Sequence, residues 1–157
     1  MLAGAFRLWR NANRDTKSGR SSRPPAGPIF LGALLLICAL PAHADEKFID
    51  DWYVALMAVD QEKLGAMIAP DLQVRLLDLH VVQTRDQFVA SLDQWAKAAD
   101  GASVKHRVVA TDGDITSVLA CYDFPANEVL MSETFRVVDN LLVESVQRMV
   151  AETCDGY

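Results

Sequence analysis

The sequence has little of what marks several large classes of protein. It holds three cysteines and three histidines in 157 residues. No Cys-x-x-Cys or His-x-x-x-His spacing occurs among them, so we expect no zinc or other metal site. There is also no glycine-rich loop of the kind that holds phosphates, which speaks against a nucleotide. We therefore expect neither a metal nor a cofactor.

Basic residues are scarce beyond residue 44. The full chain carries 15 Lys and Arg against 21 Asp and Glu, and residues 1–44 contain 6 of the former but only Asp15 of the latter. Residues 45–157 therefore hold 9 basic and 20 acidic residues, a formal charge of −11. Such a charge repels nucleic acid and anionic lipid. We expect no nucleic-acid partner.

No apolar run is long enough to span a bilayer, which needs about 20 residues in a helix. The longest run, Ile29–Leu40, follows a segment that carries six Arg and Lys and precedes Ala42-His43-Ala44. A basic segment, a short apolar segment and a small-x-small ending are typical of a signal peptide. We predict that residues 1–44 are removed by cleavage between Ala44 and Asp45. The protein is then periplasmic or secreted, without a stable membrane anchor.

Two alternatives to cleavage remain open at this point. In the first alternative, the apolar run is not removed and anchors the protein in the membrane, although it is short for that purpose. The second is lipid attachment at Cys38, which is disfavoured because Ile37 stands where bacterial lipoproteins have a small residue.

Two cysteines remain once the leader is removed, Cys121 and Cys154. An even number of cysteines in an exported protein predicts a disulfide, which contributes roughly 2–4 kcal/mol. The alternative is one buried thiol and one unpaired thiol near the C-terminus.

Hydrophobic spacing predicts three helices in the first half of residues 45–157. The first covers about Glu46–Val59, because Phe48, Ile49, Trp52 and Leu56 recur at helical spacing. A short second helix covers about Gln61–Ile68. The third follows Thr84, which with Gln87 forms a capping box.

Strands account for most of the rest. The first is expected over Leu72–Leu77, with a short one around Leu79–Gln83. Four longer strands then form two hairpins; they are expected over Val104–Thr111, Ile115–Asp123, Val129–Val138 and Leu142–Val150. This order predicts one α+β domain over residues 45–157, in which a curved, mostly antiparallel sheet wraps around three helices.

The same order resembles the nuclear transport factor 2-like superfamily, which includes ketosteroid isomerases and SnoaL-like proteins. The similar segments are an aromatic-rich first helix around Trp52–Asp60, the entry to the first strand at Ala69–Val74, and the closing hairpin Phe135–Glu144. Val59 and Asn140 stand where the family often has glycine. The resemblance implies a cone-shaped α+β barrel that often dimerises through the outer face of its sheet. We expect a homodimer, with exposed apolar positions such as Val109 and Val118 on that face.

The resemblance does not carry over ketosteroid-isomerase chemistry. The family's first-helix tyrosine falls on Trp52 and its base aspartate falls on Leu76. An indole cannot ionise in that role and a leucine has no polar atom. We therefore assign no specific reaction.

Strand alternation gives a sharper test, because successive side chains point to opposite faces. It puts Glu133 on the same face as Met131 and Phe135, and His106 on the same face as Val104 and Val108. Burial raises the pKa of a carboxyl group, and a carboxyl group near an imidazole can transfer protons. Glu133 and His106 are therefore candidate catalytic residues. The alternative is that Glu133 forms a structural hydrogen bond or lies at a dimer interface on the other side of the sheet.

Three more residues are candidates for contacting a ligand. Gln147 is expected to face inward with Ser145, Val143 and Met149. His80 follows the inner face of the first strand, if that strand is unbroken, and Trp52 lies on the first helix. Tyr122-Asp123-Phe124-Pro125 could rim the mouth of a pocket or be a plain strand exit.

Three functions are consistent with these features. The first is an exported protein that binds a small apolar ligand, and the second is an interaction domain that forms a dimer. The third is a small cofactor-free enzyme, an isomerase, dehydratase or hydrolase, that uses Glu133 and a histidine. We favour binding or interaction over catalysis.

Overall fold

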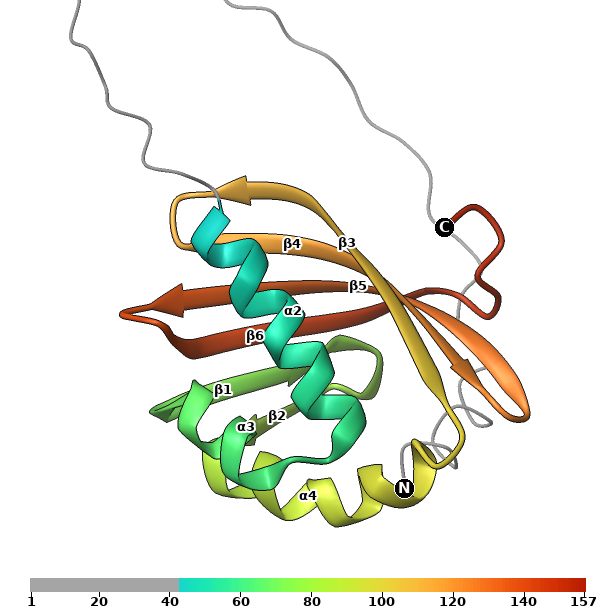
Figure 1. Cartoon of the computed structure of the whole chain (residues 1–157), viewed down its shortest axis with the longest axis horizontal. Coiled ribbons are helices and arrows are strands. Elements are labelled where there is room, and N and C mark those ends of the chain that lie inside the picture. Colours follow the sequence, from blue (N-terminus) through green and yellow to red (C-terminus); the bar gives the residue numbers. More distant parts are fainter. Residues whose placement is uncertain (1–42) are drawn as a thin grey trace, which may run out of the picture.

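The computed structural model describes residues 43–157. Three helices and one six-stranded sheet make up this part of the chain (Figure 1). The predicted leader lies outside it, except that His43 and Ala44 begin the first described helix, and Cys38 lies outside it altogether. Among the described residues, no helix is both long and apolar enough to cross a membrane.

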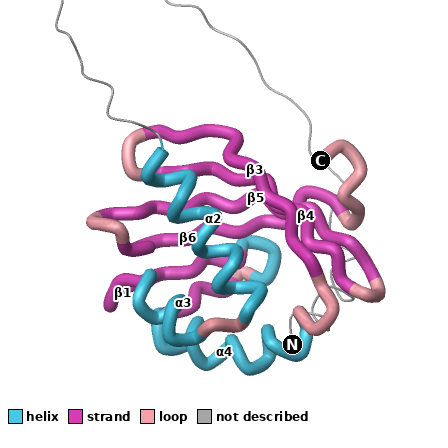
Figure 2. Tube along the Cα trace, viewed as in Figure 1, coloured by secondary structure: helices cyan, strands magenta, loops and turns pink. Residues whose placement is uncertain are grey.

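The sheet has the strand order β2-β1-β6-β5-β4-β3. Its strands are β1 (Ile68–Leu76), β2 (Val81–Thr84), β3 (Ser103–Asp112), β4 (Ile115–Phe124), β5 (Asn127–Val138) and β6 (Leu141–Ala151). Only β1 and β6 pair in parallel. The sheet curves, and helices α2 (His43–Ala58), α3 (Gln61–Met67) and α4 (Arg85–Ala98) lie on its concave side (Figures 1 and 2). The predicted α+β fold is confirmed.

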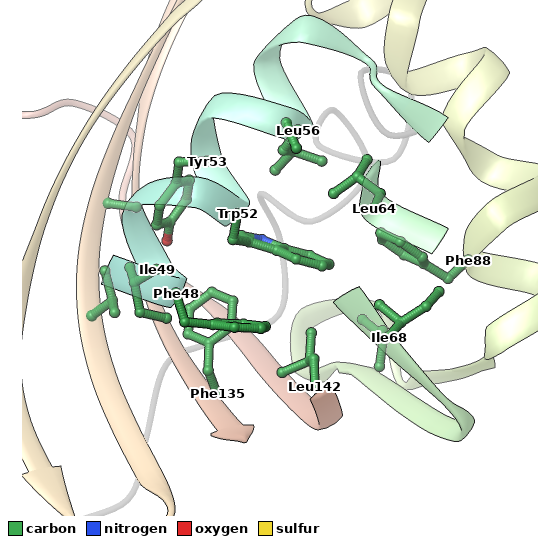
Figure 3. Packing of buried hydrophobic residues seen from close by; sticks show 14 of the residues in the cluster. Phe48, Ile49, Trp52, Tyr53, Leu56, Leu64, Ile68, Phe88, Phe135 and Leu142 are labelled. Atoms are coloured by element: carbon green, nitrogen blue, oxygen red, sulfur yellow. The ribbon is translucent and has the colours of Figure 1, made fainter. Parts of the chain in front are cut away.

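Helix α2 runs across the inner face of the sheet and supplies much of the core. Phe48, Ile49, Trp52 and Leu56 are buried at helical spacing, as predicted, and Tyr53 is buried beside them. Figure 3 shows Trp52 at the centre of this cluster, with Phe88 of α4 on one side and Phe135 of β5 below. The ring centroids of Trp52 and Phe88 are 5.7 Å apart. Burial of large side chains like these stabilises a fold by roughly 1.5–3 kcal/mol each.

Helix α2 ends at Val59, whose φ is +52°. The amide of Asp60 donates to the carbonyl of Ala55 and the amide of Val59 donates to the carbonyl of Leu56. These two bonds form the Schellman ending, in which the left-handed residue is usually glycine. A β-branched residue is strained in this left-handed conformation.

Helix α4 begins with the predicted capping box. The amide of Gln87 donates to the Thr84 hydroxyl over 3.4 Å, and the amide of Thr84 donates to the Gln87 side chain over 2.9 Å. Phe88 and Leu92 are buried against the sheet. The cap fixes where the helix starts and therefore which face it turns toward the core.

The first strand is broken, which corrects one expectation. Leu77–Leu79 form a single 3-10 turn, η2, and His80 follows with φ of +53°. The carboxylate of Asp78 accepts a hydrogen bond of 2.6 Å from the amide of Met149. This contact with a distant strand ends the alternation of β1, so His80 leaves the inner face and is exposed.

The four long strands form the two predicted hairpins. Gly113 has φ of +61° in the first turn, and Asp139 and Asn140 have φ of +50° and +62° in the second. Two successive left-handed residues suit a tight hairpin, and asparagine tolerates that conformation better than most residues.

Two predicted side-chain positions are wrong. Val118 is buried with an exposed fraction of 1%, because it pairs with Glu133 and shares its inner face. Val143 was expected to face inward, but a register shift between Arg136 and Val137 leaves it without a partner in the ladder. Leu142 takes the buried position instead.

The predicted disulfide between Cys121 and Cys154 is present. Cys121 precedes Tyr122 on β4, so the disulfide lies on the outer face of the sheet, opposite the tyrosine. The amide of Cys154 also donates to the Glu128 carboxylate over 3.0 Å. Arg107 lies over the Tyr157 ring, 5.7 Å from its centroid. The C-terminal segment is thus held against the outer face of β3, β4 and β5.

Candidate functional site

A cavity of about 410 Å³ opens between the inner face of the sheet and helices α2 and α4. Five aromatic side chains contribute to its wall: Trp52, Phe88, Trp95, Tyr122 and Phe124. Aliphatic side chains from β1, β5 and α4 fill most of the rest of the lining, among them Val74, Leu76, Leu92, Val129 and Met131. The volume falls in the range of small-molecule sites, roughly 300–1,000 Å³.

Glu133 is the one carboxyl group in the buried part of this lining. Its exposed fraction is 1%, and it lies on β5 directly opposite Gln147 of β6. The hydroxyl of Tyr122 donates to its Oε1 over 2.8 Å, and the hydroxyl of Tyr53 donates to its Oε2 over 3.0 Å. Each carboxyl oxygen therefore has one neutral donor.

Burial raises the pKa of Glu133 from 4.5 to about 7, because the anion loses its water. The hydrogen bonds from Tyr122 and Tyr53 act in the opposite direction, since they stabilise the charged form. Glu133 consequently changes its protonation state near neutral pH. Burial and the nearby charge of Glu133 raise the pKa of both tyrosines, so they stay neutral donors.

The two tyrosines reach Glu133 from different elements. Tyr53 comes from α2, one residue after Trp52, and Tyr122 comes from the inner face of β4. Sequence patterns put Tyr122 in a segment that could rim a pocket mouth or be a plain strand exit, and they give Tyr53 no role in a site. Both are buried polar side chains in otherwise apolar segments. A tyrosine in such a segment is a signal for a buried polar site, because its buried hydroxyl requires a hydrogen-bond partner.

His106 lies beside this site but not in the cavity lining. Its Nε2 is 2.8 Å from Oδ1 of Asp50, and its ring stacks on Tyr53 with the centroids 4.3 Å apart. The ring of Tyr53, whose hydroxyl binds Glu133, therefore adjoins both candidate catalytic residues. No hydrogen bond joins His106 to Glu133 in the described part of the chain.

The other three candidates have different positions. Trp52 and Gln147 both line the cavity, whereas His80 does not. Gln147 donates to the Ser145 hydroxyl over 3.5 Å. The Trp52 Nε1 is buried and has no hydrogen-bond partner among the described residues. The structure thus brings Glu133, Trp52 and Gln147 together and leaves out both histidines.

The mouth of the cavity lies between the end of α4 and the β4–β5 turn. Lys97 and Asp100 come from the first of these, and Pro125 and Asn127 from the second. Phe124 and Pro125 therefore line the pocket at this end, which agrees with the expectation of a pocket rim and not with that of a plain strand exit. Leu76 contributes only an apolar wall to the cavity.

Within residues 43–157, no group of three or more His, Cys, Asp and Glu is placed to hold a metal ion. Among the described residues of the buried lining, Glu133 is the group whose pKa lies near neutral pH. The arrangement can accept or donate one proton and can bind one polar group of a ligand in an apolar setting.

Comparison with known proteins gives a fold and no more. No family model and no curated protein sequence matches the chain. A SnoaL-like protein of unknown function from Burkholderia thailandensis is similar in structure, with a TM-score of 0.60 and 12% identity over 71% of this chain and 99% of that one. A protein from Kribbella flavida, provisionally assigned as a ketosteroid isomerase, has a TM-score of 0.58 and 16% identity over 67% and 76%.

A designed protein with a curved β-sheet is equally similar, with a TM-score of 0.60 and 14% identity over 72% of this chain and 90% of that one. The chain therefore has the cone-shaped α+β fold of the nuclear transport factor 2-like superfamily. Because a fold of this kind hosts unrelated functions, it assigns no specific reaction.

Proposed function

We propose that residues 45–157 bind a small, largely apolar molecule in the cavity, with its polar group against Glu133 and Gln147. The observation that carries this proposal is an open cavity of about 410 Å³ with a buried carboxyl group in its wall. Protein interiors are normally packed without voids of this size. A buried carboxyl group in an apolar wall is costly, which favours a role in recognising a ligand.

Binding is tested by titrating the purified domain with neutral apolar fluorophores. Ala98 of α4 lines the cavity, so Ala98→Trp places an indole where the ligand would lie. Ala90 is exposed on the same helix and outside the lining, so Ala90→Trp is the matched control. We expect Ala98→Trp to weaken binding by about tenfold or more and Ala90→Trp to leave it within about twofold. Equal affinities in the two variants, or no binding to the wild type, would contradict the proposal.

Catalysis is the second candidate, and the pKa of about 7 at Glu133 favours it. A group with that pKa can act as acid and as base at neutral pH. His106 was expected to transfer protons together with Glu133. This role has less support, because His106 does not line the cavity. Mass spectrometry of a bound ligand after incubation tests this candidate. Conversion by the wild type but not by Glu133→Gln would support an enzyme, and an unchanged ligand would leave a binding protein.

Export and dimerisation remain proposals. A disulfide suits an oxidising compartment such as the periplasm or the exterior. Val109 of the edge strand β3 is 51% exposed, which suits an interface with a second copy. N-terminal sequencing of the exported protein should find Asp45 first, and sedimentation should give twice the mass of residues 45–157. A retained leader or a monomer would contradict the respective proposal.

A further inference from the structure

We propose that the ligand of this cavity is a hydrophobic amine whose ammonium group binds the carboxylate of Glu133. This inference rests on the proposed binding function and narrows it from an apolar molecule to an apolar cation. It follows from three observations: the missing countercharge at Glu133, its free acceptor positions, and the aromatic wall around it.

No Lys or Arg of the described residues forms an ion pair with Glu133. Several surface carboxylates of the described residues pair with Lys or Arg, but Glu133 belongs to none of these ion pairs. Its two hydrogen-bond partners, Tyr53 and Tyr122, are neutral. Both hydroxyls donate, which is the arrangement that supports a carboxylate and not a carboxylic acid. Above about pH 7 the site therefore holds an anion for which the described residues supply no cation.

The carboxylate of Glu133 also has free acceptor positions. An ionised carboxyl group offers about four acceptor sites, and the two tyrosines use two of them. Gln147, directly opposite on β6, donates through Nε2 to Ser145, which leaves its amide oxygen as a further acceptor. An ammonium group has three donors and no acceptor, so it matches this set. Among the described residues, a ligand carboxylate would find one unpaired buried donor, Trp52 Nε1, but it would meet the like charge of Glu133 and the acceptor oxygen of Gln147.

The aromatic wall is the third observation. Trp52, Trp95 and Tyr122 line the same cavity as Glu133, together with two phenylalanines. The face of an aromatic ring attracts a cation, by about 0.5–2 kcal/mol depending on how dry the site is. The lining is mostly apolar, so both this attraction and the carboxylate's charge act more strongly there than at the surface.

The other charged groups around Glu133 do not supply the cation. Tyr53 stacks on His106, whose Nε2 contacts Oδ1 of Asp50 and not Glu133. At the mouth, exposed Lys97 is accompanied by exposed Asp100. With Glu133 ionised, the lining carries a net negative charge, and residues 45–157 as a whole carry −11. Both favour the approach of a cation.

The test uses three ligands that share one ring system and differ in one group: naphthylmethylamine, naphthylmethanol and naphthoic acid. At pH 8 we expect the amine to bind the wild type about tenfold or more tightly than the alcohol, with the acid weakest. The advantage of the amine should shrink as the pH falls below about 7, where Glu133 becomes protonated. Glu133→Gln should remove the advantage at every pH and leave the alcohol within about twofold.

Asp139→Asn is the matched control, because it removes one negative charge from the β5–β6 turn, outside the lining, and asparagine suits the left-handed conformation there. It should leave all three affinities unchanged. Carbon-13 NMR of the Glu133 carboxyl group adds a readout that does not need a variant. Amine binding must lower its titration midpoint, since binding and ionisation are linked.

The outcomes separate the two proposals. An alcohol that binds as well as the amine, or an amine that leaves the Glu133 midpoint unchanged, would overturn the amine inference and leave the binding function standing. A failure of all three ligands would overturn both.

Discussion

Glu133 and Glu144 make the clearest comparison in this molecule. They lie on the adjacent strands β5 and β6, one on the inner and one on the outer face of the sheet. In both residues, each carboxyl oxygen has a partner side chain. Glu133 has the hydroxyls of Tyr122 and Tyr53 at 2.8 and 3.0 Å. Glu144 has the guanidinium groups of Arg75 and Arg136 at 2.8 and 3.7 Å.

The difference lies in charge and water. Glu144 is partly exposed and is neutralised by two cations that water also screens. Glu133 is buried with neutral donors, so its pKa rises to about 7. The charge of Glu144 on the outer face is therefore balanced by cations of the protein, whereas that of Glu133 on the inner face is not. We locate function on the inner face for this reason.

The largest expected effect concerns the outer face, where the disulfide closes a loop of 33 residues. Replacing both cysteines with alanine should lower the free energy of unfolding by about 4 kcal/mol, mainly because the unfolded chain gains freedom. Urea denaturation measures this loss. Where the variant remains folded, its affinity for a cavity ligand should stay within about twofold of the wild type. A large loss of affinity would show that the two faces are not independent.

The next effect concerns pH and Glu133. Its folded-state pKa of about 7 lies above 4.5, so the folded state binds the proton more tightly than the unfolded state. Stability from this group is complete below pH 4.5 and falls as the pH rises toward and past 7, by about 3 kcal/mol in total. Urea denaturation across this range should show the decline in the wild type and in Glu144→Gln. Its persistence in Glu133→Gln would remove Glu133 as the cause.

A smaller effect tests the tyrosine donors. Tyr122→Phe and Tyr53→Phe each remove one hydrogen bond to the carboxylate, worth roughly 1.5–3 kcal/mol for a charged acceptor. The pKa of Glu133 should therefore rise further, by about one to two units. Carbon-13 NMR of its carboxyl group measures the midpoint directly. Tyr157→Phe removes a hydroxyl from the outer face and should leave the midpoint unchanged; a shift there would contradict the assignment.

Much of this fold could be predicted because its signals are local. The capping box at Thr84 and Gln87 and the turn at Asp139 and Asn140 each lie within a few residues of sequence. The disulfide could be predicted because residues 45–157 contain only two cysteines. The break after β1 was missed because its cause, the contact of Asp78 with Met149, joins residues far apart in the sequence.

The site could be predicted only in part for a similar reason. Alternation correctly put Glu133 and Gln147 on the inner face, since it depends on one strand at a time. It also put His106 on that face, but it gives no position relative to α2, and Tyr53 from α2 stacks on His106. The partners of Glu133 come from α2 and β4, so they required the packed structure.

The smallest expected effect is at Glu144, and it completes the comparison. Glu144→Gln removes the charge between Arg75 and Arg136 while keeping the size of the side chain. Because these groups are exposed to water, the free energy of unfolding should change by less than about 1 kcal/mol, and added salt should reduce the change further. Urea denaturation at low and high salt measures both. A change in the free energy of unfolding as large as the pH-dependent decline predicted for Glu133, about 3 kcal/mol, would mean that the outer ion pairs, and not burial, set the electrostatics of this sheet.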